Sequence, residues 1–238
     1  MIPSIPQKIK LLDANILKII AVVTMLIDHT ALAILMNRIL LPAAPISRGT
    51  GLYRLYMLYK VLRGVGRTAF PIFCFMLAEG FYHTKDRQKY ALRLLIAAIV
   101  SEVPFDLAFY DTPMYTGYQN VCFTLLLGFL LLWEWEYFKN KWYIQVVLGL
   151  LLGFTAWFFK TDYSWHGVLL IFIFYLLHDF RIPQLICGAI SMLWEWPSVF
   201  SFILLLFYNG KKGHQLKYFF YIFYPAHLFL LWILYVCL

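Results

Sequence analysis

The chain has 238 residues, of which 63% are hydrophobic and 13% are charged, and its formal net charge at pH 7 is +8. Charged residues make up roughly a quarter of a soluble globular protein, so this composition excludes that class. In a membrane protein an excess of basic residues reports the orientation in the bilayer, so it does not indicate a nucleic-acid partner.

Apolar runs long enough to form membrane helices recur along the whole chain. They predict about nine spans, at residues 16–36, 68–83, 90–109, 121–138, 142–159, 165–178, 182–195, 198–208 and 217–236. Neither an internal repeat nor a second domain is visible. We therefore predict an all-α, polytopic integral membrane bundle that forms one domain over residues 1–238.

Basic residues are concentrated in alternate loops, which places the N-terminus in the cytoplasm. Lys8 and Lys10 precede the first span, and Lys85 follows the second, whereas residues 110–120 contain no lysine or arginine. Residues 37–67 break this alternation, because they fall outside yet carry six basic residues. Within them, residues 52–63 (LYRLYMLYKVLR) have the pattern of a basic amphipathic helix in the membrane interface. This segment is either a lipid anchor or a lid over a site.

The stretch VTMLIDHTAL (22–31) places Asp28 and His29 side by side inside the first span. Ionisable residues at that depth are costly and are functional candidates by default. Neighbouring side chains point about 100° apart on a helix, so the two do not form a hydrogen-bonded dyad. Lys18, Met25 and His29, in contrast, share one face of the helix.

The alternation of loops gives each embedded polar residue a depth. His29 is expected roughly 20 Å above the inner end of its span. His227 is expected near mid-depth, with Tyr224 one turn below it. Most other candidates fall in the same outer half as His29, whereas Glu79 lies closer to the inner side. The outer set consists of Arg67, Glu102, Asp106, Asn120, Asp162 and His166.

Each candidate also has a purely structural interpretation. A membrane histidine can simply bridge two helices, and Arg67 can extend its charge to the interface. Asp162 and His166 are i and i+4 at an expected helix start, so their side chains should meet. The structural alternative is that they only cap the helix. Trp194 has the position of an interfacial belt residue.

Six stretches of the chain, in order and over nearly its full length, resemble the TraX family. They are LKIIAVVTMLIDH (17–29), GRTAFPIFCFMLAEGFYHTKDRQKYALRLL (66–95), SEVPFDL (101–107), TDYSWHGVL (161–169), LLLFYNGKKG (204–213) and FYIFYPAHL (220–228). The namesake of the family is an inner-membrane protein that acetylates the N-terminus of conjugative pilin. The family is similar to membrane acyltransferases that O-acetylate surface polysaccharides, in which an early membrane histidine, followed by arginines, is required.

The resemblance implies a multi-pass acetyl-CoA-dependent acyltransferase of the bacterial cytoplasmic membrane. Its acceptor would be an amine or hydroxyl of a peptide, lipid or glycan. The chemistry needs a base for the acceptor and a donor for the thioester oxyanion. His29 falls where the required histidine would and is assigned as the base. Arg67, in the GR-x-x-FP stretch, would hold the oxyanion or a phosphate, and Asp28 would complete the pocket or orient a neighbouring helix.

Two further groups of residues follow from the same hypothesis. CoA phosphates are expected on basic residues, and the pantetheine arm, roughly 15–20 Å long, would thread from the inner side toward His29. The cofactor set is Arg63, Lys85, Arg93, Lys211 and Lys212. The substrate-pocket set is Glu79, Glu102, Asp106, Asn120, Asp162, His166, Tyr224 and His227. Membrane lipids are expected partners, no metal site is expected, and the oligomeric state is left open.

Two other classes of function stay open at this point. Embedded Asp, Glu and His also serve proton-coupled transporters, although many carriers show an internal repeat that this chain lacks. A non-enzymatic membrane scaffold would tolerate the substitution His29→Ala.

Overall fold

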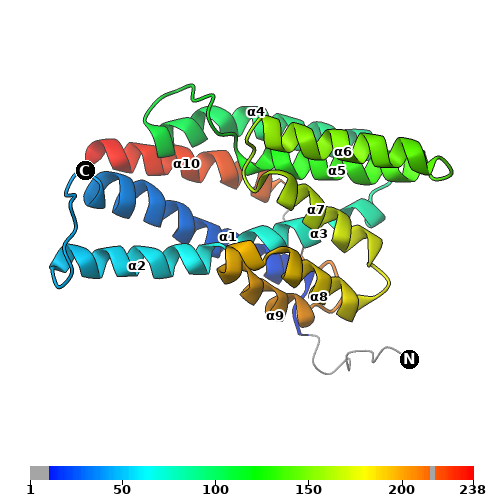
Figure 1. Cartoon of the computed structure of the whole chain (residues 1–238), viewed down its shortest axis with the longest axis horizontal. Coiled ribbons are helices and arrows are strands. Elements are labelled where there is room, and N and C mark those ends of the chain that lie inside the picture. Colours follow the sequence, from blue (N-terminus) through cyan, green and yellow to red (C-terminus); the bar gives the residue numbers. More distant parts are fainter. Residues whose placement is uncertain (1–10, 215–217) are drawn as a thin grey trace.

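The computed structural model describes residues 11–214 and 218–238, and in these ranges all regular structure is helical, without a strand (Figure 1). The predicted all-α class is therefore confirmed. Lys8 and Lys10, which helped to orient the chain, lie outside the described residues. The helices are α1 (Ala14–Thr30), the π-helix η2 (Ala31–Leu40), α2 (Gly51–Gly66), α3 (Ala69–His83), α4 (Arg87–Tyr110), α5 (Val121–Tyr137), α6 (Trp142–Phe158), α7 (Ser164–Leu176), α8 (Arg181–Ser191), the 3₁₀-helix η3 (Leu193–Phe200), α9 (Ser201–Leu206) and α10 (Phe219–Cys237).

Among the described residues, three helical stretches are long and apolar enough to cross a bilayer: Ala14–Leu40, Gly51–His83 and Phe219–Cys237. The predicted number of nine spans is not confirmed. Helix α8 has 11 residues, which rise about 16 Å, or half of a bilayer core. The following segment is interrupted by non-helical backbone at Glu195 and by Pro197. The seventh and eighth predicted spans are therefore short helices, because apolar composition alone does not show where a helix breaks.

Helix α3 lies at the centre of the packing, and α1 crosses it near the middle of the molecule (Figure 1). Helix α7 packs on α3, and α5 packs on α7. Four phenylalanines of these elements, Phe75, Phe81, Phe129 and Phe174, are fully buried. On the other side of α1, helix α10 lies against α4. The core thus joins the beginning, middle and end of the chain, which brings distant polar residues together.

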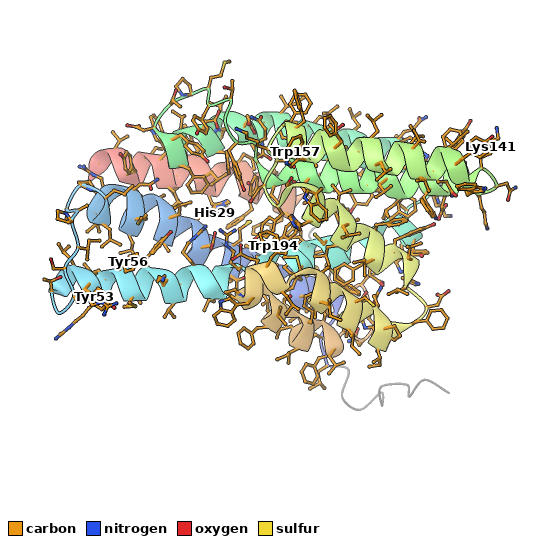
Figure 2. The ribbon with its side chains drawn as sticks, in the orientation of Figure 1. His29, Tyr53, Tyr56, Lys141, Trp157 and Trp194 are labelled. Carbon is orange, nitrogen blue, oxygen red and sulfur yellow. The ribbon has the colours of Figure 1, made fainter. Side chains whose placement is uncertain are left out.

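Residues 51–66, which contain the predicted amphipathic segment, form helix α2. The Thr50 hydroxyl caps it by accepting a hydrogen bond from the Tyr53 N–H, at 3.2 Å. The helix packs along α1 and η2, and Tyr53 and Tyr56 lie at the end remote from His29 (Figure 2). Its place at a membrane interface stays a prediction.

Helix α2 approaches α1 closely at Gly66. A Cβ atom on Gly66 would lie 2.2 Å from the Cβ of Asp28, a separation that two carbon atoms cannot adopt. Two residues earlier on the same helix, a Cβ on Gly64 would lie 3.6 Å from Pro197, which is ordinary contact. Glycine at position 66 is therefore required by the packing, whereas glycine at position 64 is not.

We expect Gly66→Ala to lower the thermal unfolding midpoint of the purified protein, because overpacking costs about 1–3 kcal/mol. Gly64→Ala is the matched control, since both substitutions raise helix propensity equally and only one creates a clash. Equal midpoints for the two variants in the same detergent would contradict the close approach of α1 and α2.

A polar cluster ties α3 to the turn after α7. The Glu79 carboxylate lies 3.3 Å from Nε2 of His178, and the Tyr208 hydroxyl donates to it at 3.5 Å. The ring of Tyr82 covers His178, with 3.9 Å between the ring centroids. The hydrogen bond to Glu79 raises the pKa of His178 above its ordinary value. Glu79 thus has a structural role, and its assignment to a substrate pocket stays a prediction.

This pair should make stability depend on pH. A raised histidine pKa gives stabilisation that is complete below about pH 6.5 and is lost as the pH rises through the raised value. The thermal midpoint should therefore fall between about pH 6 and about pH 8, and His178→Gln should remove most of that fall. His83→Gln, whose ring lies 4.0 Å from Glu79 and is 52% exposed, should retain it. A wild-type midpoint that is unchanged over this range would contradict the assignment.

Candidate active site

His29 lies near the end of α1 and meets His227 of α10. Nδ1 of His29 is 2.7 Å from Nε2 of His227, and the two rings are nearly parallel, with centroids 5.0 Å apart. Nδ1 of His227 in turn lies 2.8 Å from the carbonyl oxygen of Phe223. His227 is buried, whereas His29 is only half-buried. The two predicted histidines therefore form one hydrogen-bonded unit between α1 and α10.

The hydrogen bonds assign the protons of the neutral pair. A backbone carbonyl only accepts, so the nitrogen of His227 that faces Phe223 carries the hydrogen. Its Nε2 is then a bare acceptor, and Nδ1 of His29 must donate to it. This leaves Nε2 of His29 without a hydrogen, with its lone pair free. The hydrogen bonds thus leave Nε2 of His29 able to accept a proton.

Asp28 points away from His29 and forms an ion pair with Arg63 of α2. The expectation that the two neighbours do not form a dyad is met, and the acidic side chain instead joins two helices. Arg67 lies one turn after Arg63 at the end of α2. Its Nη1 donates to the Tyr163 hydroxyl at 3.1 Å, and its Nε lies 3.7 Å from the Glu195 carboxylate.

Asp162 and His166 do not meet, contrary to the expected i and i+4 pair. Helix α7 begins only at Ser164, and Tyr163 and Ser164 have left-handed backbone, with φ of 62° and 49°. The chain therefore turns between the two side chains. Asp162 accepts a hydrogen bond from the Tyr118 hydroxyl at 2.9 Å. Neither Tyr nor Ser favours left-handed backbone, so the sequence held no signal for this turn.

His166 instead lies between two indole rings. Its ring centroid is 3.8 Å from that of Trp165 and 4.5 Å from that of Trp194. Trp194, expected in an interfacial belt, therefore covers a candidate histidine. Sequence reasoning missed this contact, and it also missed Tyr163 and Glu195 as partners of Arg67. Such pairings depend on tertiary packing and leave no local pattern.

Three other candidates organise the loop between α4 and α5. The Asn120 side chain caps α5 by accepting from the Cys122 N–H at 3.0 Å, and it donates to the carboxylate of Glu102. The Asp106 carboxylate accepts from the Tyr115 N–H at 2.8 Å. These residues have structural partners, and their assignment to a substrate pocket stays a prediction.

Two cavities lie near these groups. The interior cavity, of about 250 Å³, is enclosed by α1, α3, α4, α5 and α10 and is lined by Lys18, Arg93 and His214, among others. Met25 and Tyr224 also line it, and they precede His29 and His227 by one helical turn. The interior cavity therefore extends from basic residues to the neighbourhood of the histidine pair.

The second cavity, of about 610 Å³, is larger and is bordered by aromatic rings. We call it the aromatic cavity; its wall includes Arg67, Trp157, Asp162, Ser164, Trp165, His166, Trp194 and Glu195. Figure 2 shows His29, Trp157 and Trp194 in the central part of the molecule. Of the predicted pocket residues, Tyr224 lines the interior cavity, and Asp162 and His166 line the aromatic cavity. The linings of these two cavities do not include the others, which are Glu79, Glu102, Asp106, Asn120 and His227.

The predicted cofactor residues are also divided. Arg93 lines the interior cavity, whereas Arg63 is paired with Asp28. Lys85, Lys211 and Lys212 are exposed on the surface. The carbonyl of Lys211 accepts from the Ala14 N–H at 2.9 Å, which places this segment beside the start of α1. Lys18 was not in the predicted set, although its place on the face of His29 was a signal for it.

The similarity of the chain to known proteins covers nearly all of this architecture. The family model described as "TraX protein" matches residues 13–235, from the start of α1 into the last turns of α10. The chain is 31% identical over 247 aligned positions to the "Probable fimbrial assembly protein FimC, serogroup H1" of Dichelobacter nodosus, with 90% of this chain and 92% of that protein covered. No solved structure matches. Since the family model spans both histidines and the lining of both cavities, the chain belongs to the TraX family.

Proposed function

We propose that the chain is a multi-pass acyltransferase of the bacterial cytoplasmic membrane, which moves an acetyl group from acetyl-CoA to an amine or hydroxyl. The observation that carries the proposal is the histidine pair, in which Nε2 of His29 has a free lone pair. Membership of the TraX family supports it. A relative named for fimbrial assembly supports a peptide, lipid or glycan acceptor in the cell envelope.

His29 would act as base and then as acid. The acceptor oxygen or nitrogen attacks the thioester carbonyl carbon while its proton passes to Nε2 of His29. When the carbon–sulfur bond breaks, the proton passes from His29 to the departing thiolate, which leaves as free thiol. Nδ1 of the imidazolium keeps its hydrogen bond to His227, and this bond is stronger while His29 is charged. The interaction therefore favours the transition state.

Two charged residues next to the pair have supporting roles in this proposal. Arg67 has five N–H donors, and the contacts with Tyr163 and Glu195 leave some of them for an oxyanion or phosphate. Asp28 holds Arg63, and through it α2, beside α1. Asp28 is thus a positioning residue rather than the partner of His29.

We assign the thioester arm and the phosphates of CoA to the interior cavity. Lys18 lies over the ring of Phe220 at 5.6 Å, and Arg93 over the ring of Tyr90 at 5.3 Å. Among the residues that the structure describes, neither cation forms an ion pair with a carboxylate. Embedded cations without counter-ions suit an anionic ligand. Lys18 is about 16 Å along α1 from His29, comparable to the pantetheine arm.

The first test is release of free thiol from acetyl-CoA by the purified protein. His29→Ala should lower the rate by about 100-fold or more, as expected for a lost general base. His227→Gln should lower it less and should shift the pH–rate profile, because it changes the proton assignment of His29. His83→Gln is the control and should leave the rate unchanged.

An unchanged rate in His29→Ala would overturn the role of the pair. If the wild-type protein neither releases thiol nor binds acetyl-CoA in calorimetry, the acyltransferase proposal fails. A carrier or a scaffold would then be the better description.

The interior cavity gives a second prediction. Val22 is buried and lines the cavity, whereas its neighbour Val23 is 51% exposed on another face of α1. Val22→Trp should fill the cavity and raise the Kd for acetyl-CoA by about tenfold or more, while Val23→Trp should not. Equal affinities in two variants with equal thermal midpoints would place the acetyl-CoA site elsewhere.

A further inference from the structure

The loop that forms one wall of the aromatic cavity has strained backbone. Lys160, Tyr163 and Ser164 have φ of 51°, 62° and 49°, in the left-handed region that non-glycine residues rarely adopt. Such residues persist only where surrounding contacts fix them, and they cluster at ligand sites. Three of the four described non-glycine residues with positive φ occur in this one loop.

The contacts that fix the loop come from the segment before α5. The Asp162 N–H donates to the Gln119 carbonyl at 2.9 Å, and the Gln119 N–H donates to the Lys160 carbonyl at 3.2 Å. The buried hydroxyls of Thr124 and Thr161 are hydrogen-bonded at 2.8 Å. Hydrogen bonds to the segment before α5 and to Thr124 therefore fix the loop, and its strained residues border the aromatic cavity.

The charges that line the aromatic cavity balance one another. Arg67 and Lys160 are opposed by Asp162 and Glu195. Each carboxylate already has a partner, since Asp162 accepts from Tyr118 and Glu195 pairs with Arg67. With two basic and two acidic residues, the lining carries no net charge that would favour a ligand ammonium or a ligand phosphate. The cavity thus suits a neutral ligand that both donates and accepts hydrogen bonds.

One further polar group is available to such a ligand. The hydroxyl oxygen of Ser164 is buried and, within the described part of the chain, has no hydrogen-bond partner. A buried hydroxyl without a partner is costly. It lines the aromatic cavity, so a ligand hydroxyl could satisfy it.

Aromatic rings supply the rest of the wall. Trp157, Trp165 and Trp194 are 58%, 43% and 50% exposed, although all three line the cavity. Indole rings present flat apolar faces with room for a second flat group. The faces of a pyranose ring carry C–H groups that pack on indole, while its rim carries hydroxyls. This combination matches aromatic walls with balanced polar groups.

From these observations we propose that the aromatic cavity binds a neutral pyranose ring of a glycan. The ring would lie against Trp194, and its hydroxyls would contact Ser164 and the groups around Arg67. We further assign this ring as the acceptor, a part that rests on the proposed acyl transfer. Helix α2 connects the two sites, because Arg67 lines the aromatic cavity and Arg63, one turn earlier, pairs with Asp28, the neighbour of His29.

The test is saturation-transfer NMR on the full-length protein in detergent. The probes are methyl β-glucopyranoside, N-acetylglucosamine and cellobiose, with a tetrapeptide that has a free amino terminus for comparison. At least one saccharide should bind, and Trp194→Ala should weaken its binding by about tenfold. Ser164→Ala, which removes only the hydroxyl, should weaken it by a smaller factor. Trp142→Ala, at a ring 73% exposed at the start of α6, is the matched control.

Each outcome of these measurements either supports or overturns part of the proposal. Saccharide binding that is equal in Trp194→Ala, Ser164→Ala and Trp142→Ala would overturn the proposal, as would the absence of binding by all three saccharides. Trp194-dependent binding of the peptide alone would show an amine site instead. If a saccharide binds but thiol release does not depend on His29, the glycan site is retained and the proposed acyl transfer fails. If thiol is released but no saccharide binds, the proposed acyl transfer is retained and the glycan site fails.

Discussion

The ion pair between Asp28 and Arg63 is the constraint on which the centre of this molecule depends. A charged pair inside an apolar helical bundle is stable only when its partners stay together, because removing one leaves an uncompensated charge. The absence of a side chain at Gly66 lets α2 come close enough to make the pair. That approach also places Arg67, one turn later, at the wall of the aromatic cavity. A structural pair thus positions a candidate site residue.

The same ion pair leaves His29 free for a different partner. Because neighbouring side chains on a helix point about 100° apart, Asp28 meets α2 while His29 faces α10 and bonds to His227. The carbonyl of Phe223 then determines which nitrogen of His29 carries no hydrogen. Proton positions in the site are therefore decided by a backbone carbonyl 194 positions along the chain from His29 (223 − 29), and not by the acidic residue beside it.

The two cavities differ in the polarity and charge of their walls. The interior cavity combines apolar walls with two cations that have no carboxylate partner among the described residues, which suits a chain with an anionic end. The aromatic cavity has balanced charges and exposed indole rings, which suits a neutral polar ring. A transferase needs two such sites with a base close to both. Met25 of the interior cavity lies one turn before His29, and Arg67 of the aromatic cavity lies one turn after Arg63, the partner of Asp28.

The sequence by itself determined the all-α class, because long apolar runs with few charges can only be buried as helices in a membrane. It also selected His29, His227 and Arg67 as candidates, since ionisable groups are costly inside apolar runs. Tertiary structure alone decided which of them meet. The pairing of His29 with His227 and the separation of Asp162 from His166 depend on contacts between distant helices and on left-handed turns at residues that do not favour them. Hydrophobicity is a property of each residue, whereas pairing and helix breaks are properties of the packing.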